Sequence, residues 1–305
     1  MNIIEYGRKL SIENLFKAKI FSNSFNFWRN EIQNILKNNN PKDYLDLGES
    51  LSNIFNSTNP DNRSQSSVSG AGSSWEALIC WYLNLVLMGE NTIVMKQNKN
   101  LIPSAISDAI SVNYGSFVSN TEADLIAITF PKNREFKMDI KNINLYDKKG
   151  NFQYLEAINN LVEKYFGEIS VHIIQCKTNW NDNAQIPMLW NMIYSSSNLI
   201  NSGHSTLSVG RNGFSLSNCK KFTYSFVTVP TVELNKFKID SVAVQRVRNM
   251  SGGTYWGYPT KSGIARNIKE MIFSNFNDNQ NFNPLKTLED YIPLLKTDYN
   301  YFGLY

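Results

Sequence analysis

The hydrophobic positions in the first 58 residues recur at helical spacing. Apolar side chains recur near the helical period between residues 15 and 36, which is typical of a helix with one buried face. They are Leu15, Ile20, Phe25, Phe27, Ile32 and Leu36. A second helical stretch follows at residues 41–55. We therefore expect residues 1–58 to form a small helical subdomain without catalytic side chains.

A polar segment separates this region from a strongly apolar one. Residues 59–74 are rich in Ser, Asn and Gly, which is typical of a loop. Residues 75–90 are apolar nearly all round, so they predict a helix buried against a sheet. Ser73 or Ser74 is the expected N-cap, and Gly89 is the expected end.

The rest of the chain alternates between strand-like and helical patterns. The strand candidates are residues 91–97, 125–130, 136–146, 168–177, 220–230 and 238–247, and the helix candidates are residues 154–166, 186–200 and 264–276. This order predicts an α/β (α+β) fold with a central mixed sheet flanked by helices. We expect a core at 75–230 and a C-terminal region at 231–305.

The strand that begins near Glu168 carries polar side chains where burial is expected. Its apolar run predicts a strand buried on both faces. Gln175 and Lys177 end it on one shared face. Either the strand reaches the surface there, or the pair points into a site at the strand end. Burial of an unpartnered lysine or amide costs several kcal/mol, about 2 to 7 for an amide, which favours the site.

Composition narrows the function classes. Three cysteines without CxxC spacing indicate reduced core residues of a cytosolic protein, and two histidines give little material for a zinc site or a Ser-His relay. A formal net charge of +4 permits a polyanion partner without demanding one. No apolar run has the length of a membrane span, and residues 1–10 lack a secretory apolar core. We expect a cytoplasmic protein with no membrane partner.

Asp124 opens the strand candidate at 125–130, upstream of the Gln175-x-Lys177 pair. An acid at the start of one strand and Gln-x-Lys on a later strand resembles the PD-(D/E)xK nuclease superfamily, in the variant of Mrr-like restriction enzymes. The resemblance covers about the middle third of the chain. It implies a restriction-endonuclease-like core that runs helix, three strands, helix, strand. The acid lies on the second strand and (D/E)xK on the third.

Two assignments fit this order. In one, Asp124 joins Asp139 and Lys141 of the 136–146 strand. In the other, Asp124 joins Gln175 and Lys177 across a longer insertion. We favour the second, because alternation in a strand with one solvent-exposed face already explains Asp139 and Lys141. The sequence alone leaves both open.

The resemblance implies a Mg²⁺ site. Asp124 is then the principal ligand, Gln175 and Glu76 complete the shell, and Lys177 orients water or stabilises the transition state. A glutamine contributes no charge, which puts more weight on Asp124 and on Glu76 or Glu122. Glu76 also has a structural explanation, since an acid in a first helical turn is favoured by the helix dipole.

Two segments could contact DNA. Residues 246–266 combine aromatics and glycines with basic side chains, namely Arg246, Arg248 and Lys261. Residues 178–185 are rich in amides, namely Asn179, Asn181, Asn183 and Gln185. The alternatives are a solvated loop with a structural Trp256, and amides that cap the next helix.

The resemblance therefore implies a type II-like restriction endonuclease in the bacterial cytoplasm. It would hydrolyse double-stranded DNA at a specific site with Mg²⁺, as a homodimer, with a cognate DNA methyltransferase as genetic partner. The C-terminal region would supply DNA-recognition and dimerisation elements. The alternatives are another defence or repair nuclease of this fold, and a catalytically inactive DNA-binding protein.

Overall fold

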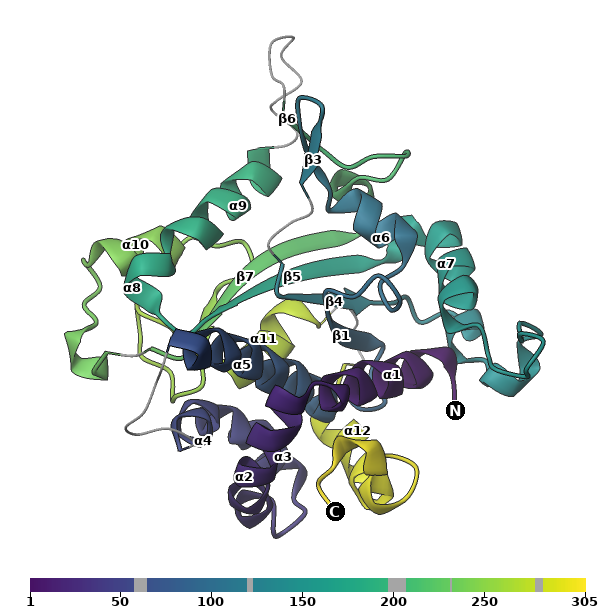
Figure 1. The fold of residues 1–305 in the computed structure, drawn as a ribbon, viewed down its shortest axis with the longest axis horizontal. Coiled ribbons are helices and arrows are strands. Elements are labelled where there is room, and N and C mark those ends of the chain that lie inside the picture. The colour runs from purple at the N-terminus through teal and green to yellow at the C-terminus, as the bar shows by residue number, and fades with distance from the viewer. Residues whose placement is uncertain (58–64, 120–122, 197–206, 231, 278–281) are drawn as a thin grey trace.

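The computed structural model describes residues 1–57, 65–119, 123–196, 207–230, 232–277 and 282–305. Within these ranges the protein is mixed α/β, with a six-stranded central sheet, a separate three-stranded sheet and flanking helices (Figure 1). Within the same ranges, none of the helices has both the length and the apolar character that crossing a membrane requires.

The central sheet has the order β1-β4-β5-β7-β8-β9. Its strands are β1 (Thr92–Lys96), β4 (Leu125–Thr129), β5 (Ser170–Lys177), β7 (Lys221–Thr228), β8 (Thr254–Trp256) and β9 (Arg266–Asn267). The β1–β4 and β4–β5 pairs are antiparallel, and the β5–β7, β7–β8 and β8–β9 pairs are parallel. The sheet is therefore mixed, as the sequence predicts.

β5 lies in the middle of this sheet, between β4 and β7. Val171 and Ile173 belong to the core on one face of the sheet, and Ile174 and Cys176 belong to the core on the other. Residues 170–176 are all buried, which confirms the prediction of a strand covered on both faces. The central position of β5 therefore fixes the side chains at its ends.

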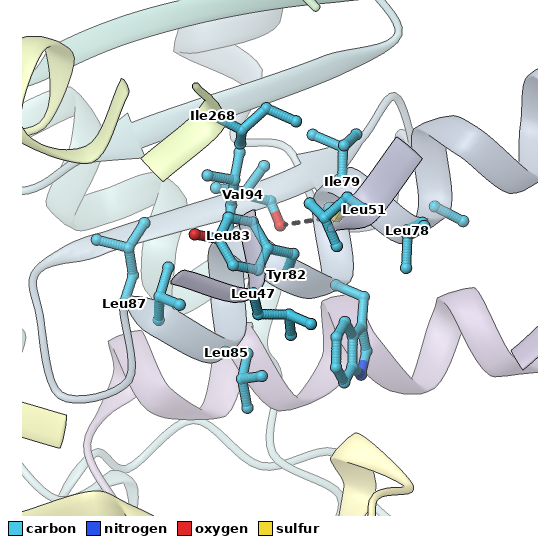
Figure 2. Packing of buried hydrophobic residues seen from close by; sticks show 14 of the residues in the cluster. Leu47, Leu51, Leu78, Ile79, Tyr82, Leu83, Leu85, Leu87, Val94 and Ile268 are labelled. Atoms are coloured by element: carbon cyan, nitrogen blue, oxygen red, sulfur yellow. Dashed lines mark hydrogen bonds between the residues drawn. The ribbon is translucent and has the colours of Figure 1, made fainter. Parts of the chain in front are cut away.

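One face of the sheet is covered by the long helix α5 (Gln65–Val86) and by N-terminal and C-terminal helices (Figure 1). These are α1 (Ile3–Lys17), α2 (Lys19–Ile35), α3 (Pro41–Asp46), α4 (Leu51–Asn56), α11 (Ile268–Asn275) and α12 (Pro284–Tyr291). The helical prediction for the N-terminal region is confirmed over residues 1–57. Figure 2 shows Leu83 and Tyr82 of α5 in one cluster with Val94 of β1 and Ile268 of α11. The N-terminal helices thus share a hydrophobic core with the sheet.

The opposite face carries a second core and the smaller sheet. Its helices are α6 (Ser104–Ala109), α7 (Tyr154–Lys164), α8 (Trp180–Asn183), α9 (Gln185–Ser196) and α10 (Val242–Val247). The smaller sheet joins β2 (Val112–Tyr114) to β3 (Phe117–Ser119) and β6 (Leu207–Val209), and it projects away from the main sheet (Figure 1).

The outer edge of β1 is closed by side chains. Asn84 of α5 accepts from the backbone N–H of Val94 at 3.2 Å and donates to the Val94 carbonyl at 2.7 Å. The Ser11 hydroxyl of α1 donates to the same carbonyl at 2.9 Å. Arg8, fully buried, donates to the Asn84 side-chain oxygen at 3.2 Å and is paired with Glu5. One amide thus gives Val94 the two hydrogen bonds that a further strand would give.

Three predictions of local structure are wrong. Residues 65–74 are helical and form the first part of α5. The buried apolar part of α5 is a stable helix, and extending a formed helix by further residues is easier than starting a new one. Residues 136–146 form no strand: they hold short 3₁₀ turns at Arg134–Lys137 and Ile140–Asn142. β4 is paired with β1 on one side and with β5 on the other, so the alternating segment cannot pair with β4. Residues 238–247 form no strand: Val242–Val247 is the helix α10, in which Val244 and Val247, three apart, both reach the core.

Candidate functional site

The candidate site lies where β4 begins and β5 ends. The antiparallel register pairs Leu125 with Ile174, so Asp124 stands opposite Gln175. Gln175 and Lys177 share a face of β5. The structure therefore brings together three side chains that the sequence singles out from positions about fifty residues apart.

The carboxylate of Asp124 is bound to the end of β5. Its Oδ2 atom accepts a hydrogen bond from the backbone N–H of Cys176 at 2.7 Å. The Lys177 Nζ atom lies 3.8 Å from the same oxygen. The Asp124 side chain is 17% exposed, so its charge is largely removed from water. The carboxylate oxygen is therefore preorganised to bind a cation. The ammonium group beside it is positioned to bind an anion.

Burial raises the pKa of Asp124 to about 6. The nearby charge of Lys177 opposes this rise, and the negative charge of Glu76 adds to it. Glu76, on α5, therefore acts electrostatically on Asp124. A carboxyl whose pKa is raised by burial and by a nearby carboxylate is one whose charge a bound cation would stabilise.

Glu76 comes to the site from α5. Its Oε2 atom lies 2.8 Å from the Nζ atom of Lys96, the last residue of β1. That ammonium group also donates to the Ser73 hydroxyl at 3.1 Å. α5 begins at Gln65, so Glu76 is well inside the helix and not in its first turn. The helix-dipole explanation for Glu76 is wrong, because the dipole acts only within the first turn.

Gln175 is fully buried, and one of the two polar atoms of its amide group has a hydrogen-bond partner. Its Oε1 atom accepts from the hydroxyl of Tyr224, on β7, at 2.7 Å. Its Nε2 atom has no partner among the described residues. A tyrosine hydroxyl can donate or accept, so rotating the amide by a half turn would pair the nitrogen with Tyr224 and free the oxygen. A buried amide end without a partner is a position at which a water or an ion can supply the missing partner.

The side chains offer oxygen ligands only. Among the described residues, no group of three His, Cys, Asp or Glu side chains is arranged to hold a metal ion. The site instead has two carboxylates, Asp124 and Glu76, and the amide of Gln175. This donor set fits Mg²⁺, which prefers oxygen, keeps several of its waters and needs only one or two carboxylates.

The other site candidates from the sequence lie elsewhere or outside the described residues. Asp139 accepts from the N-terminal amine of Met1 at 2.7 Å and from the backbone N–H of Lys141 at 2.9 Å, and these contacts lower its pKa. Asp139 and Lys141 stand in an exposed turn and not on a strand beside Asp124. Glu122 lies outside the described residues.

The amide-rich segment follows β5 directly. Asn179 precedes α8, Asn183 donates to the Asn179 carbonyl at 3.2 Å, and Gln185 is exposed at the start of α9. Asn181 lies within α8, but its side chain is outside the described part. Trp180 anchors the segment, since it is buried and donates to the Ala243 carbonyl at 3.2 Å.

In the basic segment, residues 246–266, some side chains are exposed and others make structural contacts. Arg248 is exposed and Arg246 half-buried, both at or near the end of α10. Lys261 donates to the backbone carbonyl of Leu234, so it ties two loops together. Trp256 is buried in β8, as its structural explanation requires. α10 packs against α8 and α9, which places this segment near the amide-rich one.

Sequence reasoning misses two residues of the site. Tyr224 reads as an ordinary core residue of an apolar strand, and nothing in its spacing points to Gln175. Lys96 ends an apolar strand as Lys177 does, and that parallel is a usable signal. The site rests on this geometry alone, because no model of a known protein family and no curated protein matches the chain.

Proposed function

We propose that this protein is a Mg²⁺-dependent endonuclease that hydrolyses phosphodiester bonds in double-stranded DNA, a type II-like restriction endonuclease. The single observation that carries the proposal is the position of Asp124. Its partly buried carboxylate stands opposite Gln175 and 3.8 Å from the Lys177 ammonium group, at adjoining ends of neighbouring antiparallel strands.

The order of elements supports the same proposal. The central-sheet strands β1, β4, β5 and β7, with α5 before them and α9 between β5 and β7, follow the order helix, three strands, helix, strand, and α6, β2, β3, α7, α8 and β6 are inserted between them. Asp124 stands at the start of the second of these strands, and the Gln-x-Lys pair ends the third. A restriction-endonuclease-like core has this order, with the acid and the lysine at these places.

The proposed chemistry is attack of a water oxygen on the phosphorus atom of the backbone. A new P–O bond forms, the bond from phosphorus to the sugar oxygen breaks, and the leaving oxygen takes a proton. A bound Mg²⁺ supplies charge neutralisation and a more acidic water. Asp124, Glu76 and the Gln175 amide oxygen would hold the cation. Lys177 orients the water or stabilises the negative charge that grows on the phosphoryl oxygens.

The proposed partners follow from this reaction. Asn179, Asn183 and Gln185 directly follow the site strand, and Arg248 is exposed beyond them, so these side chains can contact phosphates or base edges. A homodimer suits cleavage of both strands of a palindromic site. A cognate methyltransferase would protect the host DNA in a bacterial cytoplasm.

The test is incubation of the purified protein with plasmid DNA and Mg²⁺, beside single variants. We expect discrete fragments from the wild type, loss of cleavage with Asp124→Ala and Lys177→Ala, and unchanged fragments with Lys141→Ala as the matched control. Loss with Lys141→Ala and survival with Lys177→Ala would contradict the assignment to β5. Methylated and unmethylated plasmids distinguish a nuclease that needs modified DNA.

One observation favours a second candidate, a catalytically inactive DNA-binding protein. Gln175 stands where a carboxylate is usual, and its oxygen is bound to Tyr224. Such a protein would bind duplex DNA equally well with Asp124→Ala, and it would show no turnover with any divalent cation.

A further inference from the structure

Lys96 is a second lysine of the same cluster, and it reaches the cluster from a different strand than Lys177. β1 and β5 flank β4, and the register pairs Lys96 with Leu125, the residue after Asp124. The Lys96 ammonium group lies 2.8 Å from Glu76 and lowers the pKa of Asp124, so its charge acts on both carboxylates. Its side chain is 25% exposed, as is that of Lys177.

Without a cation, the four side chains balance each other. Asp124 and Glu76 carry two negative charges when ionised, and Lys96 and Lys177 carry two positive ones. A divalent cation held by both carboxylates takes over the neutralisation of that pair. The two ammonium groups then have no carboxylate to neutralise, and they stand as two positive charges beside the cation.

This surplus matches the charge of the reaction. A phosphodiester carries one negative charge, and attack by hydroxide produces a phosphorane-like state with two. Cationic groups placed where charge develops stabilise that state most strongly in a site shielded from water. Two lysines equal this charge, whereas Lys177 alone supplies half of it.

We propose that Lys96 is a second phosphate-binding cation of this site, paired with Glu76 in the free protein and transferred to the scissile phosphate when a divalent cation binds. This proposal rests on the proposed function. It assigns to Lys96 a contact with the substrate and not only support of Glu76.

The experiment measures duplex binding and cleavage for Lys96→Met and Lys96→Arg. Binding to a labelled duplex, taken from a fragment that the wild type cleaves, is measured against salt concentration with Ca²⁺ in place of Mg²⁺. Each phosphate contact adds about 0.9 to the slope of log affinity against log salt. We expect Lys96→Met to lower the slope by about one contact and to slow cleavage by about 100-fold or more. Lys96→Arg keeps the charge and should retain the slope.

Lys164→Met is the matched control, since Lys164 forms an ion pair with Glu135 at 2.7 Å on the distant helix α7. It should change neither quantity, and thermal unfolding checks that each variant is folded. An unchanged slope in Lys96→Met overturns the proposal, and a raised Mg²⁺ requirement with it would leave Lys96 as a residue that only positions Glu76. A wild type that neither binds nor cleaves duplex DNA overturns the proposed function as well.

Discussion

The Asp124 carboxylate accepts its 2.7 Å hydrogen bond from the backbone N–H of Cys176, and not from a side chain. A backbone donor in a central strand cannot swing away, so it holds the carboxylate in a mostly buried position. The raised pKa of Asp124 is the electrostatic consequence. Such shifts concentrate at functional sites, because a purely structural acid gains nothing from burial beside another acid.

This shift predicts that Asp124 destabilises the protein at neutral pH. Its pKa is raised from 3.8 to about 6 on folding, so the folded state binds the proton more tightly and loses relative stability as pH rises from about 4 to 6. Asn has the same shape and can accept from Cys176. We expect Asp124→Asn to be more stable at pH 8 by roughly 2 to 3 kcal/mol, and equal to the wild type below pH ~4. Urea denaturation at pH 4, 6 and 8 measures this, and a constant difference would contradict it.

The same carboxyl predicts a pH dependence of cation binding. A ligand must be deprotonated to bind a metal, so binding competes with the proton on Asp124. We expect the apparent Mg²⁺ affinity to be constant above pH ~7 and to fall by up to about tenfold per pH unit below 6. Calorimetric titration of the DNA-free protein measures the affinity without turnover. Proton uptake in place of release on Mg²⁺ binding at pH 6 would be inconsistent with this site.

Tyr224 is predicted to hold the Gln175 amide. Tyr224→Phe removes the hydroxyl that donates to the fully buried Gln175 amide, which costs about 1 to 3 kcal/mol of unfolding free energy. We also expect a higher Mg²⁺ requirement for cleavage, since the amide is no longer oriented. Tyr194→Phe is the control, because it removes another buried hydroxyl, which donates to the Ile110 carbonyl at 2.8 Å. An equal rise in both variants would assign the effect to stability alone.

His172 predicts a titration of opposite sign. It is fully buried, its Nδ1 atom lies 2.7 Å from the Thr223 hydroxyl, and burial lowers the pKa of His172 to about 3. The unfolded chain takes up the proton near pH 6.5, so this contribution to stability is full above that pH and is lost toward pH 3.

We therefore expect the wild type to lose up to about 1.4 kcal/mol per pH unit below 6.5 through this residue. The slope should be shallower in His172→Asn, although that variant is less stable at pH 7. Chemical denaturation from pH 7 to 4 measures both slopes, and parallel slopes would exclude this role for His172.

The sequence predicts the central strands well because their signal is local. Residues 91–97, 125–130, 168–177 and 220–230 are short apolar runs bounded by polar segments, and each becomes a strand of the sheet. It fails at 136–146 and 238–247, where alternation and β-branching are typical of strands. Whether such a segment joins a sheet depends on a free edge elsewhere in the fold, and the local pattern holds no information about that.

The sequence likewise predicts part of the candidate site and misses the rest. The proximity of Asp124, Gln175 and Lys177 follows from strand ends, which the sequence marks. Lys96 and Tyr224 act through contacts with Glu76 and Gln175, and those contacts depend on how α5 and β7 pack. The sequence singles out Glu76 because an acid is rare in an apolar helix. It does not predict where Glu76 lies in that helix, because α5 begins at Gln65 and the polar composition of residues 65–74 predicts a loop.

The Asn84 amide that closes the edge of β1 has a consequence for the behaviour of the protein at high concentration. An open strand edge is a template on which a second chain can add its own strand, and β-sheet aggregation begins at such edges. Here the amide, the Ser11 hydroxyl and the covering helix α1 occupy the hydrogen-bonding groups of Val94. Loss of α1 together with the Asn84 side chain would free these groups on the strand that carries Lys96, and the resulting chain would be more prone to aggregate through this edge.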